Sequence, residues 1–108
     1  MTLREKVLEL QKEIANPKTL TPDRAAEILL DLTARLSFVN DQIRERDVAY
    51  NVKLLACYEK EEKANRAKII AETSPEYILK REARDTRELM IELMRSIKFY
   101  LKNEKYEY

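Results

Sequence analysis

The chain of 108 residues contains no glycine. At the usual frequency of ~7%, a chain of this length would carry about eight. Glycine is the default residue wherever the backbone needs a positive φ angle, as in tight hairpins, phosphate-binding loops and many helix C-caps. Its absence argues against Gly-rich nucleotide-binding loops and β-hairpin architectures.

The composition is that of long helices with ion-paired outer faces. Charged residues make up 38% of the chain but nearly cancel, leaving a formal charge of +1, and 44% of the residues are hydrophobic. Balanced charge with this much apolar content is unlike a disordered chain. No apolar run approaches the roughly 20 residues that span a bilayer, and residues 1–6 are charged, without an apolar signal core. We expect a cytoplasmic protein.

The residues that most often carry catalysis are scarce. There is no histidine, hence no imidazole proton shuttle or metal ligand, and the one cysteine cannot form an intramolecular disulfide or a thiolate metal cage. Cys57 falls in an apolar column with only Lys53 and Lys60 as nearby cations, so a buried structural cysteine is expected and not a catalytic thiolate. The sequence predicts no enzyme, no cofactor, no metal and no small-molecule substrate.

Three helix starts can be recognised. Thr2 and Glu5 match a capping box, while Thr21-Pro22-Asp23 and Ser74-Pro75-Glu76 each combine an N-cap hydroxyl, a proline at the first helical position and an acid in the first turn. They predict one all-α domain over residues 1–108. A short helix ends near Asn16, a very long helix covers about 22–73, and a third covers about 75–104.

The proposed arrangement is an antiparallel, coiled-coil-like helical hairpin. If the break at 73–75 reverses the chain, the third helix runs back along residues 43–72, and the first helix covers about 22–36.

The long helix carries two columns of residues spaced by seven. One is apolar throughout: Leu29, Leu36, Ile43, Tyr50, Cys57, Ala64, Ala71. The other is apolar at its ends and basic in the middle: Leu32, Val39, Arg46, Lys53, Lys60, Ala67. This is a heptad pattern with a polar central stretch on one flank. Further apolar residues lie off these columns and make a second apolar surface: Leu30, Phe38, Val48, Val52, Leu54, Leu55, Ile70.

Such an apolar surface predicts a homo-oligomer, a dimer or larger, because extended apolar patches mark interaction sites and two-fold dimers are the commonest oligomers. The predicted oligomer interface comprises Leu29, Leu32, Leu36, Val39, Ile43, Tyr50 and Leu54.

Carboxylates cluster in two places, at Glu59, Glu61 and Glu62 and again at Glu82, Asp85, Glu88 and Glu92. Facing carboxylates on helices can hold Mg²⁺, which prefers oxygen ligands. Basic residues interleave with these acids at four-residue spacing, however, as in Glu62 with Arg66 and Arg84 with Glu88. This pattern favours solvated, ion-paired helix faces over a metal site.

The C-terminal stretch combines basic and aromatic residues: Arg95, Lys98, Lys102, Lys105, Tyr106 and Tyr108, beside Phe99 and Tyr100. A basic groove with aromatic platforms suits single-stranded nucleic acid, where bases stack and phosphates pair with Lys and Arg. The alternative is structural, with Tyr100 in the core, Phe99 against a partner and the cations complementing the helix dipole. We therefore treat these six residues as a nucleic-acid or protein-partner face.

Two pieces of the C-terminal half, residues 67–77 and 88–101, and the run Ile97-Lys98-Phe99-Tyr100-Leu101-Lys102 carry a resemblance. Over residues 64–108 the chain resembles small helical proteins of tailed bacteriophages, which often read Leu-Lys-Tyr-x-Leu-Lys where this chain has residues 97–102. For a phage-encoded protein, the cytoplasm is that of the host cell. The resemblance implies phage origin and carries over no functional residue. Small phage proteins that lack a catalytic signature usually act by binding other molecules. We therefore expect a homo-oligomeric interaction protein that binds a phage or host protein. The alternative is a nucleic-acid-binding accessory factor in phage recombination or replication.

Overall fold

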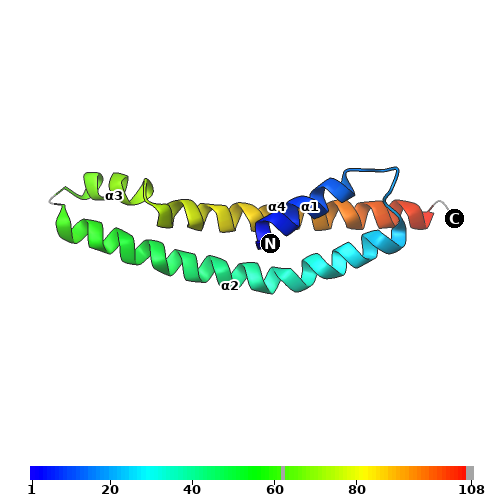
Figure 1. The fold of residues 1–108 in the computed structure, drawn as a ribbon, viewed down its shortest axis with the longest axis horizontal. Helices are drawn as coiled ribbons and strands as arrows, with labels where there is room; N and C mark the ends of the chain where they lie inside the picture. The colour runs from blue at the N-terminus through cyan, green and yellow to red at the C-terminus, as the bar shows by residue number, and fades with distance from the viewer. Residues whose placement is uncertain (62, 107–108) are drawn as a thin grey trace. The chain divides into compact units, whose positions relative to one another are not determined.

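The structure is a computed structural model that describes the backbone of residues 1–61 and 63–106 and the side chains of residues 1–61 and 63–103. The described part is all-α, as predicted. Its helices are α1 (Leu3–Ile14), α2 (Pro22–Lys60), α3 (Ala64–Glu72) and α4 (Pro75–Tyr106). The long helices α2 and α4 run in opposite directions, which confirms the antiparallel hairpin (Figure 1).

Contacts divide the chain into two compact units. Unit 1 comprises Met1–Val39 with Thr86–Tyr108, and unit 2 comprises Asn40–Asp85. The single domain predicted over residues 1–108 stays a prediction.

The predicted capping residues begin α1 and α2. Thr2 Oγ1 accepts a hydrogen bond from the backbone N–H of Glu5 at 3.1 Å, and Thr21 Oγ1 accepts one from the N–H of Arg24 at 3.2 Å. Each hydroxyl satisfies an amide that has no partner within its helix. Pro22 then occupies the first position of α2, where its missing N–H costs nothing.

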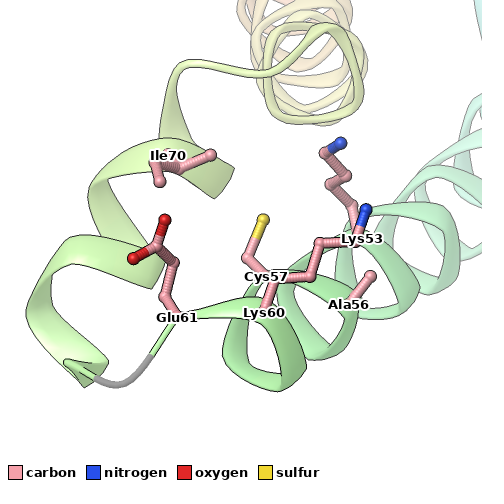
Figure 2. A pocket seen from close by; sticks show the side chains of 6 residues that line it. All are labelled: Lys53, Ala56, Cys57, Lys60, Glu61 and Ile70. Carbon is pink, nitrogen blue, oxygen red and sulfur yellow. The ribbon is translucent and has the colours of Figure 1, made fainter.

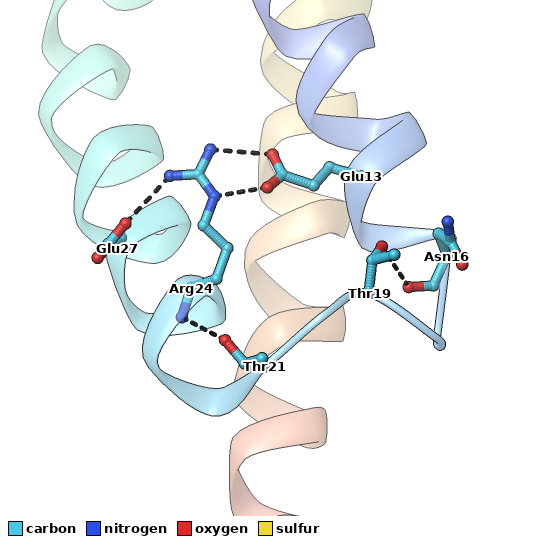
Figure 3. Close-up of polar contacts among 6 residues, drawn as sticks. All are labelled: Glu13, Asn16, Thr19, Thr21, Arg24 and Glu27. Carbon is cyan, nitrogen blue, oxygen red and sulfur yellow. Dashed lines mark hydrogen bonds and ion pairs between the residues drawn. The ribbon is translucent and has the colours of Figure 1, made fainter.

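The connection between α1 and α2 is closed by polar contacts (Figure 3). Arg24 donates from Nε and Nη2 to the two carboxylate oxygens of Glu13, at 2.5 and 2.9 Å, and from Nη1 to Glu27 at 3.1 Å. These hydrogen bonds lower the pKa of Glu13 and raise that of Arg24. Thr19 Oγ1 donates to the carbonyl of Asn16 at 3.5 Å within the loop. No described residue adopts a positive φ, so this turn needs no glycine.

Unit 1 is a three-helix arrangement around one core. The buried residues come from α1, from the connection after it, from α2 up to Val39 and from α4 beyond Thr86: Leu3, Val7, Leu10, Leu20, Ala25, Ile28, Leu32, Val39, Met90, Leu93, Ile97. Two hydrogen bonds at this core connect α4 with α1 and with the connection that follows α1. Arg4 Nη1 donates to Thr86 Oγ1 at 3.1 Å, and the Tyr100 hydroxyl donates to the Leu20 carbonyl at 3.0 Å. The first helix thus lies against the segment of α2 that the sequence predicts.

The chain reverses between the end of α2 at Lys60 and the start of α3 at Ala64, which corrects the single helix predicted over 22–73. The amide of Glu61 still donates to the Cys57 carbonyl at 3.0 Å, but Lys63 is extended, with φ −101° and ψ 119°. The physical reason is the run of five charged residues at 59–63. The run lies between Cys57 and Ala64 of the apolar column, so the chain can leave the helix there without removing an apolar side chain from the core.

The predicted break at 73–75 exists, but it does not reverse the chain. Ser74 Oγ donates to the Ala71 carbonyl at 2.5 Å and accepts from the Tyr77 amide at 3.4 Å, and Pro75 begins α4 as predicted. Both α3 and the start of α4 run back along α2 (Figure 1).

In unit 2, α2 therefore packs against α3 and the first turns of α4. Its core cluster of buried residues is Tyr50, Cys57, Ala67 and Ala71, with Leu54 and Tyr77 packed beside them. The prediction that the helix starting at Pro75 lies along residues 43–72 is wrong in its register. Arg84 pairs with Asp47 at 2.6 Å, and Arg46 Nη1 donates to the Leu79 carbonyl at 3.0 Å. The segment 64–72 occupies the place beside the end of α2.

Candidate interaction surfaces

The structure places most of the predicted oligomer interface inside the chain. Leu32 and Val39 are buried in the core of unit 1, and Leu29 and Leu36 are half-buried against it. In unit 2, Tyr50 is buried and Leu54 packs beside it, while Ile43 is half-buried. The heptad column thus serves the contacts of α2 with α3 and α4. The role of these residues between copies stays a prediction.

Burial shifts the ionisation of one of these residues. The environment of Tyr50 raises the pKa of its phenol, first because burial disfavours the phenolate and second because the Glu72 carboxylate lies nearby. The Lys80 ammonium lies 4.4 Å from the centroid of the Tyr50 ring, in a cation–π contact.

The second apolar surface is exposed, as the sequence predicts for six of its seven residues. Leu30 and Phe38 are exposed in unit 1, Val48, Val52, Leu55 and Ile70 are exposed in unit 2, and Leu54 alone is half-buried.

Three of these residues form an apolar stripe along α2. Val48, Val52 and Leu55 leave 61%, 64% and 60% of their surface exposed. Their spacing of four and three places them on one face of the helix. Tyr50 and Cys57, between and beyond them in sequence, are buried against α3 and α4 on another face. We call Val48, Val52 and Leu55 the outer stripe.

The basic face of α4 is only partly within the described residues. Arg95, Lys98 and Lys102 are exposed, and Phe99 among them is 68% exposed. Arg95 lies 3.8 Å from Glu92, a long and exposed pair. The side chains of Lys105 and Tyr106, and the whole of Tyr108, lie outside the described residues. Tyr100 belongs to the core side, where its hydroxyl bonds to Leu20.

A pocket of about 190 Å³ lies in unit 2, between α2 and α3. It is lined by Lys53, Ala56, Cys57, Lys60, Glu61 and Ile70. Figure 2 shows the Cys57 sulfur pointing into the space below Ile70, with the lysine side chains on one side and Glu61 on the other. Sequence reasoning missed this pocket, because it forms only when the chain reverses at 61–63. The sequence feature that could have indicated the pocket is the pair Lys53 and Lys60, which are basic residues in the middle of the second heptad column. Cys57 itself is buried, as the sequence predicts.

The Arg66 guanidinium is a countercharge for Glu61, because its Nε lies 3.8 Å from the Glu61 carboxylate. Within the described residues, neither Lys53 nor Lys60 has a carboxylate within 4.0 Å. The pocket therefore combines apolar lining residues with two cations that have no carboxylate partner among the described residues.

The carboxylate clusters do not converge in the described part of the chain. No group of three or more His, Cys, Asp or Glu side chains there has the arrangement of a metal site. Several acids have basic neighbours instead, including Asp47 with Arg84. The other oxygen of Asp47, Oδ1, is buried without a hydrogen-bond partner.

The helices of the described residues include none long and apolar enough to cross a membrane. Comparison with protein-family models, with curated proteins and with solved structures finds no match.

Proposed function

We propose that this chain is a non-enzymatic helical interaction module that self-associates and, as a homo-oligomer, binds another protein. The observation that carries the proposal is the outer stripe, Val48, Val52 and Leu55, which is apolar and exposed on α2. Single exposed apolar residues are common on soluble proteins, but three on one helix face form a contiguous strip of the kind that marks interaction sites. A second copy is the partner always present at equal concentration, and two-fold association is the commonest form.

The composition of unit 2 supports the same proposal. Among the described residues, the buried cluster of unit 2 consists of Tyr50, Cys57, Ala67 and Ala71, and two of these are alanines. Small cores contribute little hydrophobic stabilisation, since it scales with apolar area removed from water. Covering the outer stripe with a second copy would add to that area. Phage origin and a cytoplasmic location remain part of this proposal.

Sedimentation equilibrium at micromolar concentration tests self-association. We expect a mass of at least twice the 12.9 kDa of one chain. Val52→Glu should yield a monomer that keeps its helical circular dichroism, because it would bury an unpaired charge between copies. The matched control is Asn65→Glu, which adds the same charge at an exposed position of α3. A monomeric parent chain, or a Val52→Glu variant that associates like the parent, would refute the proposal.

The second candidate function is binding of single-stranded nucleic acid by α4. The observation favouring it is that Phe99 is exposed among the exposed cations Arg95, Lys98 and Lys102. Aromatic rings stack on bases, and each stacked base is worth roughly 1–3 kcal/mol. The test is titration of a fluorescent oligothymidine at several salt concentrations. Each phosphate contact contributes a slope of about −0.7 in log K against log salt.

Replacing Arg95, Lys98 and Lys102 by Gln should flatten that salt dependence, whereas Lys53→Gln with Lys60→Gln serves as the control in unit 2. Absence of binding at low salt would remove this candidate.

A further inference from the structure

The open face of unit 2 beside Cys57 has the chemistry of a helix-docking site. Lys53 and Lys60 are seven residues apart on α2, a separation of about 10.5 Å along one face of the helix. Both line the same pocket, together with Ala56, Cys57 and Ile70. Ile70 is partly exposed there, so its side chain offers apolar surface at the rim of the pocket.

The size of the pocket fits one apolar side chain. Its volume is about 190 Å³. An apolar cavity of ~150 Å³ holds a benzene molecule, so this pocket has room for a leucine or phenylalanine side chain. Figure 2 shows the Cys57 sulfur pointing into the space that such a side chain would fill. Interfaces of this kind commonly draw much of their affinity from an anchor residue in a pocket.

Unit 1 shows how the chain itself docks a helix. The helix α1 buries Leu3, Val7 and Leu10 at a spacing of four and three. It then pairs the acid of its last turn, Glu13, with Arg24 of α2 through two hydrogen bonds. An apolar edge with a flanking acid thus helps to hold this short helix in unit 1. In the described part of unit 2, α3 and the first turns of α4 lie along α2, and no further helix packs beside them.

We infer that this face of unit 2 docks an acidic amphipathic helix of a partner protein. One leucine or phenylalanine of that helix occupies the pocket beside Cys57, and carboxylates on either side of it pair with Lys53 and Lys60. A partner helix with acids seven residues apart matches the spacing of the two lysines. This is helix-in-groove recognition, in which apolar anchors give affinity and flanking charges select the partner.

A nucleic acid fits this face less well than an acidic helix does. Its sugar-phosphate backbone carries no aliphatic side chain that could fill the pocket beside Cys57. Glu61 on the pocket wall repels phosphate and carboxylate alike, but Arg66 lies 3.8 Å from it and offsets its charge in part, while Lys53 and Lys60 lie on the opposite side of the pocket. The inference rests on the proposed interaction role but uses a surface separate from the outer stripe.

The probe for the test is a capped, fluorescein-labelled 20-residue peptide helix with leucines at positions i, i+4 and i+7 and glutamates flanking them. A second peptide carries lysine at each glutamate position. Fluorescence anisotropy against the full chain should show saturable binding of the acidic peptide and none of the basic one. Binding should weaken with added salt, because the charges at the rim are screened.

Two variants locate the site. Lys53→Glu with Lys60→Glu should weaken binding of the acidic peptide at least about tenfold, a change of ~1.4 kcal/mol, and should create binding of the basic peptide. Ala56→Phe should fill the pocket and weaken binding to a similar degree with no change of charge. Lys98→Glu with Lys102→Glu, which makes the same charge change on α4, should leave the affinity within about twofold.

Absence of binding by the acidic peptide would overturn the inference. So would binding that persists in the Lys53 and Lys60 variant, or an oligothymidine that binds at these lysines as tightly as the peptide. If the glutamate variant loses helical circular dichroism, Lys53→Gln with Lys60→Gln replaces it, with the same weakening expected. Sedimentation of the same variants keeps the two proposals apart, because loss of peptide binding should leave self-association unchanged.

Discussion

The ring of Tyr50 lies 5.5 Å from the ring of Tyr77, centroid to centroid, and the two planes are tilted by 52°. The first tyrosine comes from α2 and the second from the first turn of α4. Tilted aromatic pairs at this separation contribute beyond the area they bury. The pair therefore defines the register in which the two arms of unit 2 meet.

A double-mutant cycle should detect this contact. Tyr50→Ala and Tyr77→Ala should each lower the free energy of unfolding, and their effects should fall short of additivity by about 0.5–1.5 kcal/mol, the value of an aromatic pair. Urea titration followed by circular dichroism provides the four free energies. A cycle between Tyr50 and Phe99, which lies in unit 1, is the control and should be additive. Additive effects for Tyr50 and Tyr77 would contradict the register.

The raised pKa of Tyr50 predicts a loss of stability in alkali. In the unfolded chain a tyrosine ionises near pH ~10. The folded chain holds its proton to higher pH, so the full contribution is present below pH ~10 and is lost as pH rises above it. Urea midpoints at pH 8 and pH 10.5 should differ less in Tyr50→Phe than in the parent. Tyr58→Phe, at an exposed position of the same helix, should behave like the parent.

The ion pair of Glu13 with Arg24 predicts a loss of stability in acid. Hydrogen bonds from Arg24 lower the pKa of Glu13 in the folded chain. Its contribution is therefore present above the unfolded value of ~4.3 and lost as pH falls below it. Arg24→Gln should reduce the change in urea midpoint between pH 6 and pH 3. Arg95→Gln removes a longer, exposed pair and should leave that change as it is in the parent.

In α2, substitutions at a buried and at a nearby exposed position should differ strongly in their effect on the free energy of unfolding. Ile28 is fully buried, whereas Leu30 is 72% exposed. Ile28→Ala should lower the free energy of unfolding by roughly 2–5 kcal/mol, because it removes buried methyl groups and leaves a cavity. Leu30→Ala should change it by less than about 0.5 kcal/mol. Equal effects at the two positions in chemical denaturation would contradict the orientation of α2.

The helix starts could be predicted from sequence because each depends on a few adjacent residues. Thr2, Thr21 and Ser74 all act as N-caps, and Pro22 and Pro75 begin their helices. The apolar columns likewise predicted burial of Leu32, Val39 and Tyr50. These signals are local, and tertiary contacts reinforce them.

The reversal at 61–63 could not be predicted in the same way. No proline, glycine or N-cap hydroxyl occurs between Lys60 and Ala64. The charged run at 59–63 permits α2 to end there, but the reversal also depends on the packing of Ala67 and Ala71 against Tyr50 and Cys57, which joins residues distant in sequence. Because the register of the hairpin follows from the position of the turn, the pocket beside Cys57 was missed for the same reason.

The position of the reversal also sets the order in which the chain can assemble. In unit 2 the contacts of Arg46 with Leu79 and of Asp47 with Arg84 join residues 33 and 37 apart, while in unit 1 the contacts of Arg4 and Tyr100 join residues 82 and 80 apart. Closing a loop twice as long costs about 0.6 kcal/mol more, and long-range contacts slow folding. On the ribosome, unit 2 has all its residues before the α4 segment of unit 1 is made. The part of the unit 1 core that Met90, Leu93 and Ile97 complete therefore stays open until α4 is made, a window in which a chaperone can act.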